Sequence, residues 1–173
     1  MSSEASAAII GAAVATLGVL LVEVLLKPAF ARKRVTRVLL SELQLNSRLL
    51  RKIQEHRAAN PDSVSESLHI SDRGWQAIAQ DLHYLPTKAL NSLILLYGKY
   101  EEINQLVRDH SHKGDMIFQI GEGPQVKWLF AELQHAAAIL DKSLPDALAH
   151  TERATTLLKQ HLDEAIPDLL PDA

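Results

Sequence analysis

The chain has 173 residues, of which 47% are hydrophobic, with a mean hydropathy of -0.03 and a formal net charge of -3. This composition excludes a wholly disordered chain, and the absence of cysteine excludes disulfides, thiolate metal ligands and a cysteine nucleophile. Leucine and alanine dominate while aromatic residues make up 5% of the chain, which favours an all-α fold.

The first predicted element is a helix over residues 5–26, which reads ASAAIIGAAVATLGVLLVEVLL and carries one charge. A helix of this length spans about 33 Å, close to the roughly 30 Å of a bilayer core. Five cations follow it directly: Lys27, Arg32, Lys33, Arg34 and Arg37. Because positive charge collects on the cytoplasmic side, the pattern predicts a single-pass membrane protein with residues 1–4 outside, the bulk of the chain in the cytoplasm and the cations against anionic lipid headgroups. A buried helix of a soluble protein is the alternative.

Two features inside this predicted span concern packing and charge. Gly11, Ala15 and Gly18 are small residues at spacings that let two helices approach closely, so a homo-oligomer through the span is one interpretation, and lipid-facing filler is the other. Glu23 lies four residues before Lys27, which favours an ion pair along one helix over an intramembrane functional site.

Behind the span, the sequence predicts a basic neck at residues 27–37, a bundle of about four long helices at 38–166 and a tail at 167–173. Removing the five cations of the neck from 18 leaves 13 Lys and Arg, and removing Glu4 and Glu23 from 21 leaves 19 Asp and Glu. The body therefore has a balance of -6, which argues against nucleic-acid binding because that function needs a basic face.

The first two predicted helices of the bundle differ in length. The first is amphipathic and runs from Phe30 to about Arg57, and residues 58–67 then interrupt its period with Pro, Asn, Asp and Ser. The second is short and begins with Ser71 or Asp72 as its N-cap.

The third predicted helix begins at Pro86 and runs to about His110. Residues 110–125 contain three glycines and a proline, so we expect a break there that includes a turn or a short extended piece at 116–120.

Proline also marks the last two predicted helices. Pro124 opens the fourth, and Ser143-Leu144-Pro145 is typical of the cap and first turn of a fifth. Pro167 and Pro171 end it.

Three polar side chains stand where the helical pattern expects apolar ones. Glu42 and Asn46 lie in the apolar arc of the first helix of the bundle, and Asn104 lies in that of the third. A buried polar group without a partner costs about 1–3 kcal/mol, so these side chains are expected to be hydrogen-bonded. They predict a structural network that fixes helix register, in which Glu42 or Asn46 bonds to Asn104, Tyr97, Tyr100 or Trp75. The alternative is a polar pocket in which a sensor or small enzyme binds its ligand.

Eight histidines raise the question of a metal site. Glu132 and His135 form an E-x-x-H motif of the kind found in di-iron bundles, but His135 points away from the apolar arc of its helix. The second copy of the motif, at residues 66–69, falls at the edge of a polar loop, and the H-x-H pair at 110–112 alone is weak. We therefore predict no metal site and no cofactor. The lack of phosphate-loop and nucleophile-elbow motifs also disfavours an enzyme.

One combination of residues carries a resemblance. Glu42 and Asn46 form an E-x-x-x-N pair, Trp75 opens the next helix, and residues 97–106 read Y-x-x-x-x-x-I-N-x-L. Over residues 5–107 this combination resembles short, single-span, helical membrane proteins of bacteria that have no assigned function. The resemblance implies the architecture and carries over no activity.

The sequence thus favours an interaction or scaffold protein whose acidic bundle is presented to a protein partner in the cytoplasm. The ligand sensor or small enzyme at Glu42, Asn46 and Asn104 is a second hypothesis. A third is an accessory subunit of a larger membrane complex, in which Glu23 and the face around Gly11 contact other spans.

Overall fold

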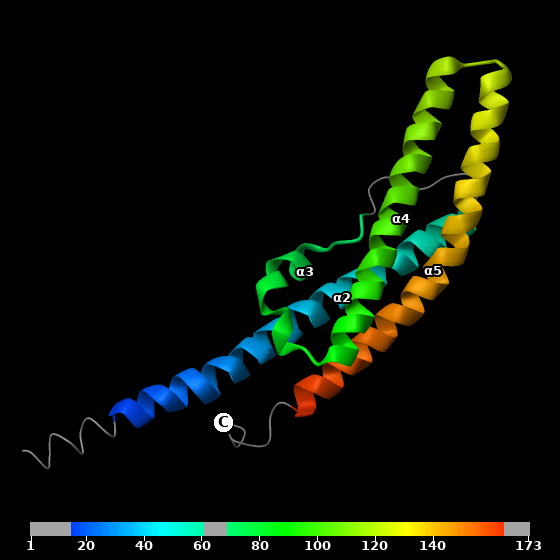
Figure 1. The fold of residues 1–173 in the computed structure, drawn as a ribbon. Coiled ribbons are helices and arrows are strands. Elements are labelled where there is room, and N and C mark those ends of the chain that lie inside the picture. The colour runs from blue at the N-terminus through cyan, green and yellow to red at the C-terminus, as the bar shows by residue number, and fades with distance from the viewer. Residues whose placement is uncertain (1–14, 61–68, 165–173) are drawn as a thin grey trace, which may run out of the picture.

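A computed structural model of the chain describes residues 15–60 and 69–164, which form helices and contain no strand (Figure 1). The predicted all-α fold is therefore confirmed for these residues. The elements after residue 20 are a π-helical segment η1 (Leu21–Leu26), α2 (Lys27–Ala59), α3 (Arg73–Ala77), a 3-10 helix η2 (Ala79–Tyr84), α4 (Thr87–Ile120) and α5 (Pro124–Glu164).

Three long helices build the fold. α4 and α5 form an antiparallel hairpin, and α2 packs against it (Figure 1). The bundle is staggered: the helix formed by residues 15–30, here called the arm, projects past one end, while α4 and α5 continue past the end of α2 at the other. We call this second projection, residues 111–137, the tip. The core between the two ends includes Leu39, Leu43, Leu50, Leu93, Leu96, Ile103, Leu140, Leu144 and Leu158.

The helix of the arm continues into α2 without a break. Pro28 lacks an N–H, and its ring crowds the carbonyl group of Val24 one turn earlier. The backbone adopts the wider π-helical turn at η1 just before the proline, which accommodates this missing bond.

The predicted membrane span is corrected by this structure. Among the described residues, no helix combines the length and the apolar character needed to cross a membrane. The apolar part that is described, residues 15–26, is followed in the same helix by the charges of the neck, such as Lys27 and Arg32, which lower the mean hydropathy of any longer window. This finding contradicts the prediction of a single-pass protein with its N-terminus outside. Residues 5–14 of the predicted span lie outside the described residues.

The segment between α2 and α4 packs against both. Ile70, Ile78 and Leu85 are buried in the core, and the short helices α3 and η2 contact α2. The predicted short second helix is therefore present at Arg73–Ala77, with a 3-10 helix after it.

The predicted break within residues 110–125 is present, but it is confined to residues 121–123. α4 stays helical as far as Ile120, so no extended piece forms at 116–120. Gly114 does not interrupt the helix, whereas Gly121 has a φ of 75°, which a residue with a side chain rarely adopts, and its N–H bonds to the Ile117 carbonyl oxygen at 3.1 Å. The glycine with positive φ, rather than the number of glycines, determines where α4 ends.

The predicted start of a fifth helix at Ser143 is also wrong, because α5 runs through Pro145. Leu144 and Ala147 are buried in the core on either side of this proline, and their packing holds the segment helical despite the lost N–H. Figure 1 shows α5 bowed along its length. The described residues therefore contain three long helices where the sequence predicted about four.

Candidate functional site

Glu42 lies buried on α2 and organises the N-terminus of α3. Its Oε1 accepts hydrogen bonds from the Ser71 hydroxyl at 3.0 Å and the Gly74 N–H at 2.7 Å, and its Oε2 accepts from the Trp75 N–H at 3.0 Å and the Tyr97 hydroxyl. Backbone N–H groups in the first turn of a helix have no partner within the helix. The carboxylate of α2 thus caps α3 together with Ser71, whose hydroxyl oxygen accepts from the Arg73 N–H at 3.3 Å, while the side chain of Asp72 makes no capping bond.

The surroundings of this carboxylate are close-packed. A Cβ added to Gly74 would lie 3.0 Å from a carboxylate oxygen of Glu42, so glycine allows the close approach. The Tyr97 ring stacks on Trp75 at 4.7 Å between centroids. Burial and the hydrogen bond to Glu42 raise the pKa of Tyr97, which therefore remains a protonated donor at neutral pH.

The two asparagines hold the chain that precedes α3. The Asn46 side chain donates to the Ser71 carbonyl oxygen at 2.7 Å and accepts from the Ser71 N–H at 3.0 Å. Asn104, on α4, makes the same pair of bonds with Ile70, both at 2.9 Å. Each side-chain amide thus bonds to both the N–H and the C=O of one backbone residue, as a neighbouring strand would. Together the two amides hold the segment against α2 and α4.

Glu42, Asn46 and Asn104 are all buried. The structure brings the first two to Ser71 and the third to Ile70. Their side chains bond to other groups of the chain itself. This arrangement has the geometry of a network that fixes register.

The cations of the predicted neck lie on the first turns of α2. Lys27 pairs with Glu23 in the same helix, as the sequence predicted, and Arg34 pairs with Asp81 of η2. Arg32 and Arg37 are exposed, and Lys33 is partly buried.

The predicted helix-packing face is described only in part. Ala15 and Gly18 are helical and exposed, and a Cβ on Gly18 would have no neighbour within 4 Å. Gly11 lies outside the described residues.

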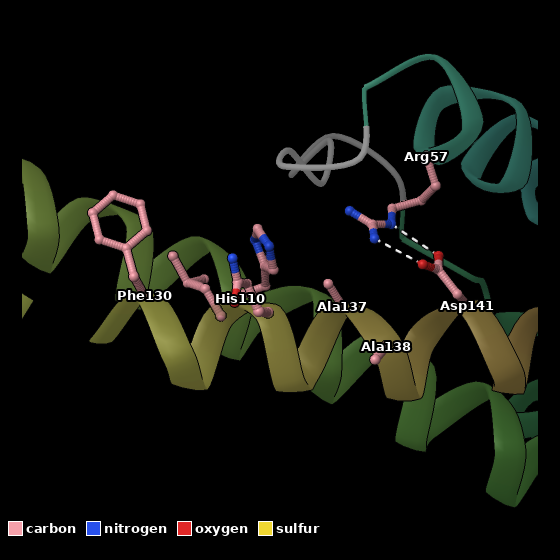
Figure 2. Close-up of a pocket in the computed structure, with 8 residues that line it drawn as sticks. Arg57, His110, Phe130, Ala137, Ala138 and Asp141 are labelled. Carbon is pink, nitrogen blue, oxygen red and sulfur yellow. Dashed lines mark hydrogen bonds and ion pairs between the residues drawn. The ribbon is translucent and has the colours of Figure 1, made fainter. Parts of the chain in front are cut away.

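A groove opens where α2 ends against the hairpin. Arg57, in the last turn of α2, donates from Nε and Nη2 to the two carboxylate oxygens of Asp141 on α5 at 3.0 and 2.9 Å (Figure 2). The Arg57 side chain is 5% exposed and that of Asp141 is 51% exposed. Burial, with Arg57 and Lys113 nearby, lowers the pKa of His110, and the Arg57 guanidinium lowers the pKa of Asp141.

The rest of the groove is largely apolar. Its volume is about 490 Å³, and α5 lines it with Phe130, Leu133, Gln134, Ala137 and Ala138. Figure 2 shows Phe130, His110 and the Arg57–Asp141 pair along the same side of α5. Sequence reasoning missed this site, although a signal existed: Arg57 falls four residues after Ile53 and seven after Leu50, on the buried face of its helix.

Beyond the groove, large apolar side chains are exposed on the tip. They are Met116, Phe118 and Ile120 on α4, with Trp128 and Phe130 on α5. The side chain of Phe118 is 92% exposed. The sequence did not predict this surface because residues 116–120 were interpreted as part of a break, with a turn or a short extended piece.

The histidine motifs give no metal site in the described residues, and Glu66 of the second motif lies outside them. In the described parts of the chain, no group of three or more His, Asp and Glu side chains is placed to hold an ion. Glu132 pairs instead with Lys113 across the hairpin at 3.2 Å.

Comparison with known proteins gives no relative for this chain. No family model matches it, and no curated protein or solved structure does so either. The resemblance to single-span bacterial proteins therefore stays a prediction.

Proposed function

We propose that the protein is a helical interaction protein, a scaffold that binds protein partners through the tip. The observation that carries this proposal is the set of five large apolar side chains exposed within the last turns of α4 and the first turns of α5. Clustered apolar side chains at a surface are typical of binding sites, and aromatic residues and methionine are enriched at interface cores.

The arm supplies a second exposed apolar surface at the opposite end of the bundle (Figure 1). Its exposed side chains include Leu17, Val19, Leu20, Val22, Val24, Leu26 and Phe30. Two such surfaces at opposite ends of a well-packed core suit a protein that joins other molecules, which supports the scaffold proposal.

The hypothesis of a ligand site at Glu42, Asn46 and Asn104 receives less support. The carboxylate and the two amides already bond to Ser71, Ile70 and the first turn of α3, so a ligand would have to displace bonds within the chain. The hypothesis of a membrane-complex subunit depended on the span that the structure contradicts, and we do not propose it.

A photo-crosslinking experiment tests the scaffold proposal in the native cell. A photoreactive phenylalanine analogue replaces Phe118 in the full chain, and a control chain carries it at Gln105, an exposed position of α4 away from the tip. We expect discrete protein adducts from position 118 that are absent from position 105. Equal yields from both positions, or no adducts at either, would refute binding through the tip.

A further inference from the structure

The face of the hairpin that receives α2 continues into the tip. On α4, Phe118 lies eighteen residues after Tyr100, and on α5, Phe130 lies eighteen residues before Leu148. Eighteen residues make five helical turns of about 3.6 residues, so each phenylalanine lies on the same side of its helix as a residue that packs in the bundle. α2 ends at Ala59 and therefore does not cover the part of this face that lies on the tip.

The groove lies at the start of this uncovered face. Arg57 and Asp141 close it at the end of α2, and Phe130 and Leu133 line it toward the tip. It is therefore continuous with the established interface between α2 and α5. Its volume of about 490 Å³ can receive aromatic side chains from a helix that takes the place of α2.

The charge of the tip indicates which molecule covers it. From residue 38 onward the chain has an excess of six acidic charges, but residues 111–137 carry two lysines against three acidic residues. One of those lysines, Lys113, is already paired with Glu132 of the same tip. A surface for a strongly basic or strongly acidic partner needs the opposite charge, whereas a nearly balanced surface can meet its own copy without repulsion.

We propose, resting on the proposed function, that a second copy of this chain covers the tip. The two tips pack face to face around a two-fold axis, so that two α4–α5 hairpins form a four-helix bundle with Phe118 and Phe130 of both copies inside. A two-fold interface uses the same patch on both copies, which requires a patch that is complementary to itself. Antiparallel hairpins with exposed apolar stripes are the usual components of such a bundle.

The absence of cysteine from the sequence allows a position-specific test. Gly114 on the tip and Gly98 in the body of the same helix both have room for a new side chain, since an added Cβ would meet nothing within 4 Å at either position. We expect the full-length Gly114→Cys chain, treated with a short bismaleimide, to give a covalent dimer on a denaturing gel. The matched Gly98→Cys chain should remain a monomer. Equal dimer yields from both chains would overturn the proposal.

Molar mass in solution provides the second test. The Phe118→Ser/Phe130→Ser chain should dimerise at least about tenfold more weakly than the wild type in sedimentation equilibrium, with unchanged helical circular dichroism because both side chains are exposed. Leu17→Ser and Val24→Ser, made together in the Gly114→Cys chain, alter the arm at the other end of the bundle and should leave the tip crosslink unchanged. A Gly114→Cys chain that gives no covalent dimer, while the photoreactive analogue at position 118 labels another protein, overturns the second-copy proposal and leaves the scaffold proposal standing.

Discussion

Replacing Glu42 by glutamine tests the polar network with almost no change in side-chain volume. The carboxylate accepts four hydrogen bonds, two from the hydroxyls of Ser71 and Tyr97 and two from the N–H groups of Gly74 and Trp75. Glutamine places an NH₂ group at one of the two oxygen positions. A hydroxyl can rotate and accept from this group, but a backbone N–H cannot, so one of the two amides of α3 loses its acceptor in either orientation of the glutamine.

The size of the effect follows from this count. A buried donor left without an acceptor costs about 1–3 kcal/mol, and the remaining bonds weaken because charge-assisted bonds are roughly twice as strong as neutral ones. Gly74 and Trp75 are partly buried, so water can replace some of the lost bonding. We therefore expect Glu42→Gln to lower the free energy of unfolding by about 2 kcal/mol.

The measurement is urea unfolding of the full chain, followed by circular dichroism, with hydrogen exchange at the first turn of α3 as a local readout. Glu102→Gln serves as the control, because Glu102 is an exposed residue of α4. Its effect should stay within about 0.5 kcal/mol of the wild type, as for most surface substitutions. A Glu42→Gln chain that unfolds at the wild-type urea concentration would refute the capping role.

Three further predictions concern the asparagine bonds to the segment before α3 and the groove at the end of α2. Asn104→Leu leaves a buried backbone N–H and C=O without partners and should lower the free energy of unfolding by about 2–4 kcal/mol in the same assay. Asp141→Asn keeps one acceptor for the buried Arg57 guanidinium and should lower the free energy of unfolding by about 1–2 kcal/mol. An unchanged urea midpoint would contradict a stabilising role for the Arg57–Asp141 ion pair. The pKa of His110 is lowered, so the unfolded chain binds this proton more readily. The free energy of unfolding should therefore fall as the pH drops below about 6.5, and His110→Gln should weaken this dependence.

The sequence predicted the buried polar residues and named Tyr97 and Trp75 among the partners of Glu42, but it did not reveal the loop groups that these residues bind. Glu42, Asn46 and Asn104 were recognisable because each interrupts an apolar arc, and helical periodicity alone defines such an arc. Their other partners are groups of Ile70, Ser71 and Gly74, which lie in the segment before α3 and in its first turn. Periodicity gives no information about backbone groups that come from a loop. The structure was therefore needed to show that these side chains hold the segment before α3.

The helix boundaries failed for a related reason. Gly114 and Pro145 are strong local signals for a break, yet both lie inside long helices. Pro145 is tolerated because Leu144 and Ala147 pack in the core on either side of it, and Gly114 costs about 1 kcal/mol, which the hairpin contacts exceed. Tertiary packing therefore outweighed local propensity wherever α4 and α5 lie against each other.

Two groups of side chains depart from the apolar interior and polar surface of a simple bundle. A carboxylate and two amides lie in the interior, where each needs its bonds, while Phe118 and Trp128 lie in solvent at one end. Buried polar groups make a bundle more specific, since a shift of register would leave them unpaired. A hairpin held in one register can present its exposed residues in one fixed arrangement beyond the point where α2 stops. Rigid presentation lowers the entropy lost on binding, which supports the proposal that the tip is a binding surface.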